Sequence, residues 1–178
     1  MKLSLFDSSH TQEVIELCTQ VFSISDGEAE GQLVGGLVAD LIAMTPPQNL
    51  IGCVAISNER IVGNIFFSHF IVPNSQLGFI LAPVAVATNV QRTGIGQQLI
   101  NYGLNYLKSL NVDLVFTYGD PAYYPKMGFR HITENVVKAP YELSLPHGWL
   151  AQSLDGNPIK PMQGVTQCVK ALSNPKYW

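Results

Sequence analysis

The sequence predicts an α/β fold built on a mixed sheet. Two observations favour this class: apolar runs with strand character alternate with helical repeats through the middle of the chain, and a hairpin of two apolar runs comes before that alternation. The hairpin argues against an all-parallel sheet, because its two strands must be antiparallel. With 178 residues, of which 47% are hydrophobic and 13% charged, the chain can bury one substantial core.

The first part of the chain predicts one strand and two helices. A short strand is expected over residues 3–7, and Ser9 with Gln12 resembles the capping box that begins a helix. A second helical stripe runs from Leu33 to Ile42 and should end before Pro46, since proline cannot continue a helix. The apolar positions that follow Gln12 at helical spacing are Val14, Leu17, Cys18 and Val21.

The remaining elements follow from periodicity and turn residues. The hairpin joins residues 50–56 and 61–72 through the turn at 57–60. The later elements are a strand over 79–87, an amphipathic helix over 94–110, a strand over 113–118 and a last strand within 165–172.

Composition excludes several classes of function. Ten basic residues stand against thirteen acidic ones, a formal charge of −3, so no broad basic field predicts nucleic-acid binding. The longest apolar stretch, Phe79 to Ala87, is too short to span a bilayer, and the first ten residues lack the apolar segment of a secretory signal. Three scattered cysteines fit reduced thiols better than a disulfide framework. We therefore expect a cytoplasmic protein that binds neither nucleic acid nor membrane.

Gly94 and Gly96 stand between a predicted strand and a predicted helix. The first turn of a helix has unpaired N–H groups that attract anions, and glycines let phosphate oxygens approach the backbone. A P-loop would need Lys and then Ser or Thr after Gly96, where Gln97 and Gln98 stand. A dinucleotide fingerprint would need a third glycine in place of Leu99. On this fragment alone, an anion loop and a plain helix start packed close to a strand both stay open.

The wider context resembles one family. The run "QRTGIG" at residues 91–96, after "VAV", is similar to the coenzyme A signature of the GNAT superfamily of N-acetyltransferases, and "YPKMGF" at 124–129 is similar to that family's Y-x-x-x-G-F motif. The form "GDPAYYPKMGF" most resembles the YhbS-like branch. The resemblance implies a mostly antiparallel, twisted sheet with flanking helices, splayed at its fourth strand. It covers about residues 3–132, so we expect one domain over 1–178 in which residues 133–178 complete or cover the sheet.

The resemblance also implies how acetyl-CoA is held. The main chain of Val84, Ala85 and Val86 would pair with the pantetheine arm as an added strand does. Pro83 independently favours a bulge there over an ordinary edge strand, since proline cannot donate to a ladder. Backbone amides of one loop would cradle the pyrophosphate, with Arg92 free to add a charged contact. The residues of that loop are Gln91, Arg92, Thr93, Gly94, Ile95 and Gly96.

The family's general acid, carried onto this chain, is Tyr124. A phenol can protonate a departing thiolate, because the ordinary pKa values of the two groups differ only moderately. Tyr123 is a rival for this role, and adjacent side chains on a helix point about 100° apart. The sequence departs from the common pattern before the tyrosine, where Asp120 and Pro121 resemble an N-cap and the first residue of a short helix. The asparagine contact to coenzyme seen in many relatives is therefore in doubt.

Other catalytic groups are not fixed by the sequence. Glu28, Glu30, His69 and Asp120 are candidates for a general base, each with an ordinary structural explanation as well. The four histidines show no metal-ligand spacing and no cysteine has a histidine partner nearby, so neither a metal nor a cysteine acyl-enzyme is expected. The predicted function is direct transfer of an acetyl group from acetyl-CoA to a small-molecule or peptide amine in a ternary complex. The alternative is a non-catalytic acyl-CoA sensor of the same fold, and a homodimer stays open.

Overall fold

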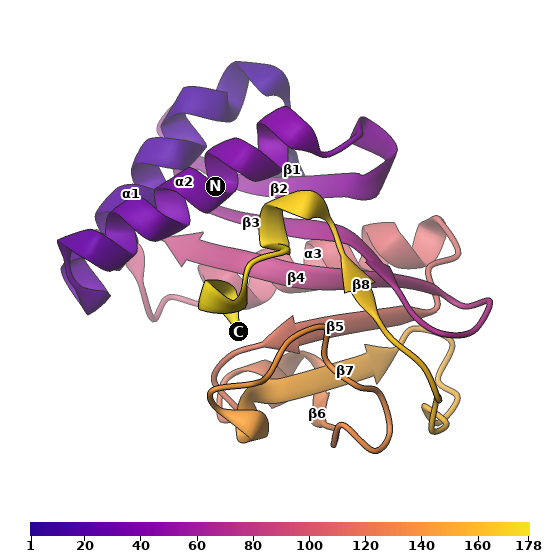
Figure 1. The fold of residues 1–178 in the computed structure, drawn as a ribbon. Coiled ribbons are helices and arrows are strands. Elements are labelled where there is room, and N and C mark those ends of the chain that lie inside the picture. The colour runs from indigo at the N-terminus through magenta and orange to yellow at the C-terminus, as the bar shows by residue number, and fades with distance from the viewer. The chain divides into compact units, whose positions relative to one another are not determined.

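The computed structural model describes residues 1–178, and its strands form a mixed sheet (Figure 1). Hydrogen bonding links eight strands in the order β1-β2-β3-β4-β5-β7-β6, and β8 pairs with β3. β4 and β5 form the parallel pair, whereas β1–β2, β3–β8, β5–β7 and β6–β7 are antiparallel. The predicted fold class, a mixed and mostly antiparallel sheet with flanking helices, is confirmed.

The elements fall close to their predicted places in the first two thirds of the chain. The α-helices are α1 (Thr11–Asp26), α2 (Glu28–Met44) and α3 (Ile95–Ser109). The strands are β1 (Lys2–Leu5), β2 (Leu50–Ser57), β3 (Arg60–Ile71), β4 (Leu77–Val86), β5 (Leu114–Tyr118), β6 (Arg130–His131), β7 (Trp149–Ser153) and β8 (Gln167–Cys168). No helix is both long enough and apolar enough to cross a membrane.

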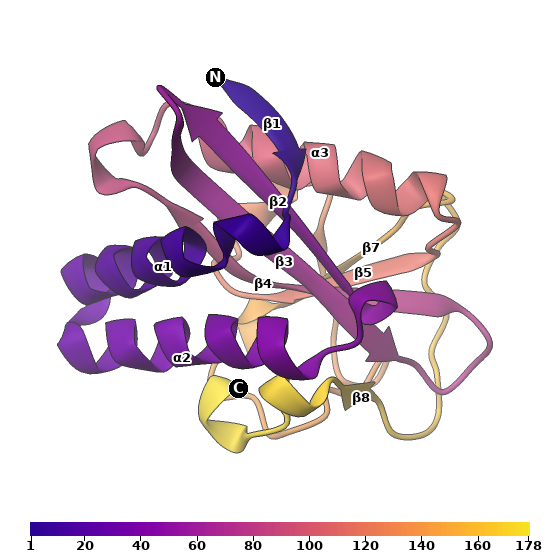
Figure 2. The ribbon, with the colours of Figure 1, turned by 90° about the horizontal axis from the view of Figure 1, so that it is seen from above.

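Two compact units make up the chain, and their boundaries cut through β3, β4 and α3. The first unit comprises Met1–Phe67 and Pro83–Gly103, and the second comprises Ser68–Ala82 and Leu104–Trp178. In the first unit α1 and α2 lie side by side (Figure 2). They are joined at Gly27, whose φ of 98° lets the chain reverse. The four apolar positions predicted for α1 are all buried, which confirms its core face.

The start of α1 differs from the prediction. Ser9 and Gln12 do not form a capping box: the Asp7 carboxylate accepts from the Ser9 N–H at 2.8 Å, and the His10 Nδ1 accepts from the Asp7 N–H at 3.2 Å. This reciprocal pair caps a short 3-10 turn, Ser8–His10, that precedes α1. Gln12 instead donates to Glu16 one turn further along the helix. The prediction was wrong because two neighbouring polar residues offered competing caps, and the chain uses the earlier one.

The second unit has an aromatic core around β5. Phe116 of β5 stacks with Trp149 of β7 at 5.4 Å between ring centroids, and both rings contact Phe70 of β3. Trp178 packs edge-on against Trp149 and donates its indole N–H to the Leu172 carbonyl at 3.0 Å. Residues 133–178 therefore contribute much of this core.

Residues 133–178, here called the tail, depart most from the sequence-based prediction. The strand expected within 165–172 is reduced to β8, two residues that pair with Phe70 and Ile71, and a 3-10 turn follows over Lys170–Leu172. Strand β7, which the sequence did not predict, pairs with β5 from Leu114↔Ser153 to Tyr118↔Trp149. Its five residues are flanked by long irregular segments, so periodicity alone could not mark it.

Candidate active site

The predicted coenzyme loop lies between β4 and α3, in the first unit. A 3-10 turn over Thr88–Val90 leaves the strand, and the chain then passes through Arg92 with φ of 62° and Gly94 with φ of 89°. The Gly94 carbonyl accepts from the Gln98 N–H at 3.0 Å, so Gly94 occupies the N-cap position of α3. The N–H groups of the following turn lack partners within the helix and carry the positive end of its dipole. A helix start of this geometry can bind an anion, and binding of the pyrophosphate here stays a prediction.

Side chains within the loop fix its conformation. The Gln91 amide donates to the Val86 carbonyl at 3.0 Å, and the Thr93 hydroxyl donates to the Val90 carbonyl at 2.7 Å. The Gln91 and Thr93 side chains thus bind their own chain, which suits a loop that offers backbone donors to a ligand. Arg92 is exposed, and its left-handed backbone is rare for a residue other than glycine. Such conformations gather at ligand sites, where the surrounding structure enforces them.

Strand β4 changes its environment at Pro83. The parallel ladder between β4 and β5 runs from Gly78↔Leu114 to Leu81↔Thr117, whereas β4 itself continues to Val86. The predicted splay beyond Pro83 stays a prediction, because the boundary between the two units falls at that residue. Of the residues expected to meet the pantetheine arm, Ala85 is buried and Val84 and Val86 are partly exposed. Their contact with coenzyme stays a prediction.

Tyr124, the predicted general acid, lies in the second unit. It begins a 3-10 turn, Tyr124–Met127, that ends at Gly128 in the left-handed region with φ of 95°. The Tyr124 ring meets Tyr123 at 5.3 Å and Phe129 at 5.8 Å between centroids, both edge-on. Burial raises the pKa of the Tyr124 phenol to about 12, against a smaller opposing effect of a hydrogen bond with Thr117. The hydroxyl therefore holds its proton at any pH near neutrality.

Tyr123 lies beside Tyr124 and, like it, is partly exposed. It is half-buried, burial raises the pKa of its phenol, and the Lys126 ammonium stands 5.9 Å from its ring centroid. The short helix expected at Asp120 forms only as a turn: the Asp120 carboxylate accepts from the Ala122 N–H at 2.8 Å, and its carbonyl accepts from the Tyr123 N–H. The N-cap role of Asp120 is thus correct, but no α-helix follows it. A turn that passes directly into a 3-10 segment is too short for helical hydrogen bonding to propagate.

Three comparisons with known proteins bear on this arrangement. The family model for an acetyltransferase (GNAT) domain matches residues 48–131. The uncharacterized N-acetyltransferase YjhQ of Escherichia coli (strain K12) is 31% identical over 159 residues, which cover 86% of this chain and 84% of that protein. The chain belongs to the GNAT family of N-acetyltransferases.

Solved structures show the same fold at lower identity. The YhbS protein of Escherichia coli, a GNAT family N-acetyltransferase solved in complex with CoA, superposes with a TM-score of 0.79 at 22% identity and covers 97% of this chain and 92% of its own. A GNAT family acetyltransferase from Brucella melitensis in complex with acetyl-CoA superposes with a TM-score of 0.71 at 21% identity and covers 97% and 99%. These likenesses agree with the resemblance that the two motifs indicated.

The structure assigns no general base to this acetyltransferase. Glu28 and Glu30 lie in the first turn of α2, where the helix dipole favours acidic residues. His69 on β3 packs against Phe79 with ring centroids 5.8 Å apart, and the Asp120 carboxylate caps its own turn. Each therefore has a structural explanation, and the base stays open.

The cysteines of this GNAT protein are buried or half-buried thiols. Burial raises the pKa of Cys18 to about 12, and likewise that of Cys53, so both stay protonated near neutrality. Burial also raises the pKa of Cys168. No group of three or more histidine, cysteine or acidic side chains is arranged to hold a metal ion.

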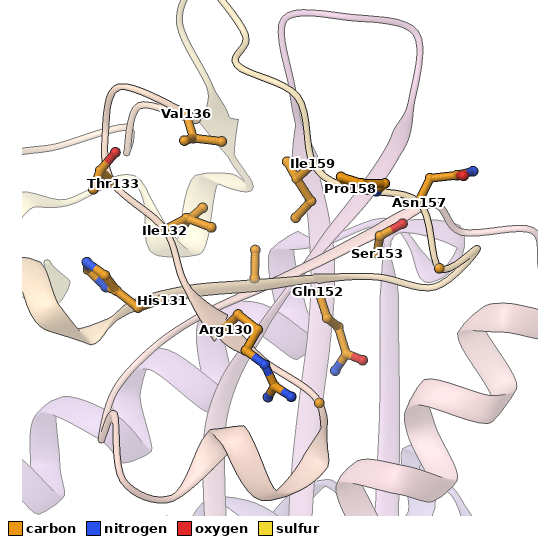
Figure 3. A pocket seen from close by; sticks show the side chains of 13 residues that line it. Arg130, His131, Ile132, Thr133, Val136, Gln152, Ser153, Asn157, Pro158 and Ile159 are labelled. Carbon is orange, nitrogen blue, oxygen red and sulfur yellow. The ribbon is translucent and has the colours of Figure 1, made fainter.

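Sequence reasoning missed a groove along the edge strand β6. A pocket of about 470 Å³ separates Ile132, Thr133 and Val136 from Pro158 and Ile159, as Figure 3 shows. A neighbouring pocket of about 330 Å³ shares His131, Ile132 and Thr133 with it and also meets His147. The His131 and His147 rings lie 5.9 Å apart. No motif marks these residues, because the tail brings them together from positions that share no periodic pattern.

Proposed function

We propose that this GNAT protein transfers the acetyl group of acetyl-CoA directly to an amine in a ternary complex. The observation that carries the proposal is the loop before α3, where the family motif coincides with a left-handed Gly94 at the N-cap position of α3. The N–H groups of the first helical turn have no partners within the helix and favour an anion. The bound CoA and acetyl-CoA of the YhbS and Brucella melitensis proteins support the same assignment. The proposal treats residues 1–178 as one cytoplasmic acetyltransferase domain.

In this proposal the backbone of residues 91–96 binds the pyrophosphate. The main chain of β4 beyond Pro83, at Val84, Ala85 and Val86, binds the amides of the pantetheine arm and offers an N–H donor to the thioester oxygen. Arg92, an exposed residue of the loop, adds a charged contact to a phosphate. The Gln91 and Thr93 side chains support coenzyme binding indirectly. They stabilise the loop conformation, because both already donate hydrogen bonds to backbone carbonyls.

The chemistry needs a nucleophile and a proton. The unprotonated amine nitrogen attacks the thioester carbon, the C–S bond breaks, and the thiolate takes a proton from the Tyr124 hydroxyl. The nitrogen loses its extra proton to a base or to water, and the phenolate is reprotonated from solvent. Holding both substrates together supplies much of the acceleration. The acceptor is a small-molecule or peptide amine.

The test is a panel of amines and lysine peptides with acetyl-CoA, followed by release of free thiol. Calorimetry with CoA alone comes first, because it measures coenzyme binding without an acceptor. We expect CoA to bind and at least one amine to give thiol and the acetylated product in equal amounts. Absence of CoA binding by folded protein would overturn the proposal, whereas binding with no turnover across the panel would favour an acyl-CoA sensor.

A further inference from the structure

Helix α3 packs against strand β3 within the first unit, and two glycines set how closely the two elements approach. Successive side chains of a strand point to opposite faces, so Gly63 and Phe67 of β3 share one face. Residues four apart share one face of a helix, so Ile95, Leu99 and Gly103 line one side of α3. All five residues are buried, and the strand face contacts the helix face.

Each end of this contact has one glycine, on opposite partners. Near the end of α3 the glycine is on the helix, where a Cβ built on Gly103 would lie 2.3 Å from the Phe67 Cε2. At the beginning of α3 the glycine is on the strand. A Cβ built on Gly63 would lie 2.9 Å from the Leu99 Cδ1 and 3.3 Å from the Ile95 Cγ2. Interiors are close-packed, so each glycine leaves a space that the opposite element fills.

The space at Gly63 also adjoins strand β4. A Cβ on Gly63 would lie 3.3 Å from the Ala85 carbonyl oxygen. Ala85 belongs to residues 84–86, which are predicted to bind the pantetheine arm, and Ile95 belongs to residues 91–96, which are predicted to bind the pyrophosphate. Gly63 therefore contacts both predicted coenzyme-binding segments, although it lies on a third element.

We infer that Gly63 is a positioning residue for acetyl-CoA, because its missing side chain lets the first turn of α3 lie at the depth that the coenzyme requires. This inference rests on the proposed coenzyme site. The pyrophosphate and the pantetheine arm belong to one covalent molecule, so both are bound only when their two segments keep one separation. A side chain at Gly63 would push against Leu99, which is fully buried, and would displace the helix start that carries it.

The chain offers a matched control for Gly63→Ala, which adds one methyl group. Gly52 is also a buried strand glycine of the first unit, on β2. A Cβ built on Gly52 would lie 2.5 Å from the Phe6 Cβ and 2.7 Å from the Phe66 Cε1, and neither residue belongs to a predicted coenzyme segment. Gly52→Ala should therefore lose at least as much stability as Gly63→Ala in thermal unfolding, because its new contacts are closer.

The first measurement needs no coenzyme. In ¹⁵N-labelled protein, the backbone amide signals of Gly94 and Gly96 report the conformation of the loop before α3. We expect both signals to move in Gly63→Ala and to stay at their parental positions in Gly52→Ala. Unmoved signals in folded Gly63→Ala would overturn the inference and leave the proposed function untouched.

The second measurement is calorimetry with CoA. The Kd should rise about 3- to 30-fold in Gly63→Ala, since a carbon forced into a packed contact shifts the groups around it. Gly52→Ala should keep the parental Kd. Parental affinity in Gly63→Ala, or an equal loss in Gly52→Ala, would overturn the inference alone. Absence of CoA binding by the folded parent would overturn the proposed coenzyme site itself.

A second substitution tests whether the crowding acts through α3. Leu99→Val removes the Cδ1 atom that the new methyl group would meet, so the double variant moves one carbon from the helix to the strand. The double variant should bind CoA more tightly than Gly63→Ala but less tightly than Leu99→Val, because the contacts of 3.3 Å with Ile95 and Ala85 remain. The comparison of the double variant with Leu99→Val also serves if Gly63→Ala does not fold. Equal affinity of those two variants would overturn the inference.

Discussion

The loop before α3 and the surroundings of Tyr124 place chemical groups in opposite ways. The loop offers backbone groups, and its conformation depends on the positive φ of Arg92 and Gly94. Its polar side chains donate hydrogen bonds to nearby backbone carbonyls. Tyr124 presents a side chain, and its position depends on packing against Gly119, Phe129 and Tyr123. A backbone site should tolerate changes of side chain but respond to changes of φ. A packed side chain should respond to the loss of a single atom.

The largest expected effect tests whether the packed Tyr124 side chain responds to the loss of a single atom. Tyr124→Phe removes only the hydroxyl, so kcat should fall by about 100- to 10,000-fold, the usual contribution of a general acid. Coenzyme affinity and folding should be kept, because the ring still fills the space beside Gly119. Steady-state turnover beside Tyr123→Phe is the measurement. If the Tyr123 variant collapses and the Tyr124 variant keeps parental turnover, the two tyrosines have been assigned in the wrong order.

The next effect tests whether the loop before α3 responds to a change in the preferred φ of one residue. Gly94→Ala adds one methyl group at φ of 89°, where the Cβ would meet only the Gln98 amide at 3.7 Å, so the cost is conformational. That cost is about 1–2 kcal/mol for an L residue in the left-handed region, so acetyl-CoA affinity should fall about tenfold by calorimetry as the loop shifts.

Gly156→Ala is the matched control for Gly94→Ala. Gly156 has φ of 80° and open space around its Cβ position, but it lies in an exposed turn after β7. Both variants should lose similar stability, and only Gly94→Ala should lose affinity. Equal affinity in the two variants would remove the loop from the coenzyme site.

The same contrast explains how far sequence could predict the site. The loop and the Y-x-x-x-G-F motif are short and contiguous, and local geometry such as φ of Gly94 and Gly128 acts within each, so the pattern carries the structure. The surroundings of Tyr124 join Gly119 and Gly148, whose contact depends on the path of the tail. Nothing in the spacing of these residues indicates that they meet.

The fold shows the same limit. Strand β4 and helix α3 have strong periodic patterns and were predicted within two residues of their observed ends. Strand β7 is five residues long and was missed, because its place beside β5 is fixed by the packing of Trp149 on Phe116. Local preference is a weak guide to short strands, since cross-strand packing decides them.

A smaller effect is expected from the side chain that stabilises the loop. Gln91→Met keeps the length of the side chain and removes its donor to the Val86 carbonyl. One neutral hydrogen bond contributes about 0.5–1.5 kcal/mol, so acetyl-CoA affinity should fall about 2- to 10-fold. Gln12→Met is the control, because the Gln12 amide also donates a single hydrogen bond, to Glu16 on α1. Parental affinity in Gln91→Met would show that the Gln91 side chain does not support coenzyme binding through the loop.

The smallest expected effect is the alkaline sensitivity that burial of Tyr124 gives to folding. The pKa of this phenol is raised from 10.0 to about 12 in the folded protein, with burial as the main cause. Below pH 10 the phenol is protonated in both the folded and unfolded chains, so it adds no pH dependence there. As the pH rises from 10 towards 12, the unfolded chain loses this proton while the folded chain keeps it, so the free energy of unfolding decreases. Urea unfolding at pH 9 and pH 11 should show a larger decrease for the parent than for Tyr124→Phe. Tyr123→Phe should be closer to the parent, because burial raises the pKa of Tyr123 less than that of Tyr124. The same decrease in the parent and in Tyr124→Phe would mean that the Tyr124 hydroxyl reaches solvent, and its position would then resemble that of an exposed loop residue rather than a packed side chain.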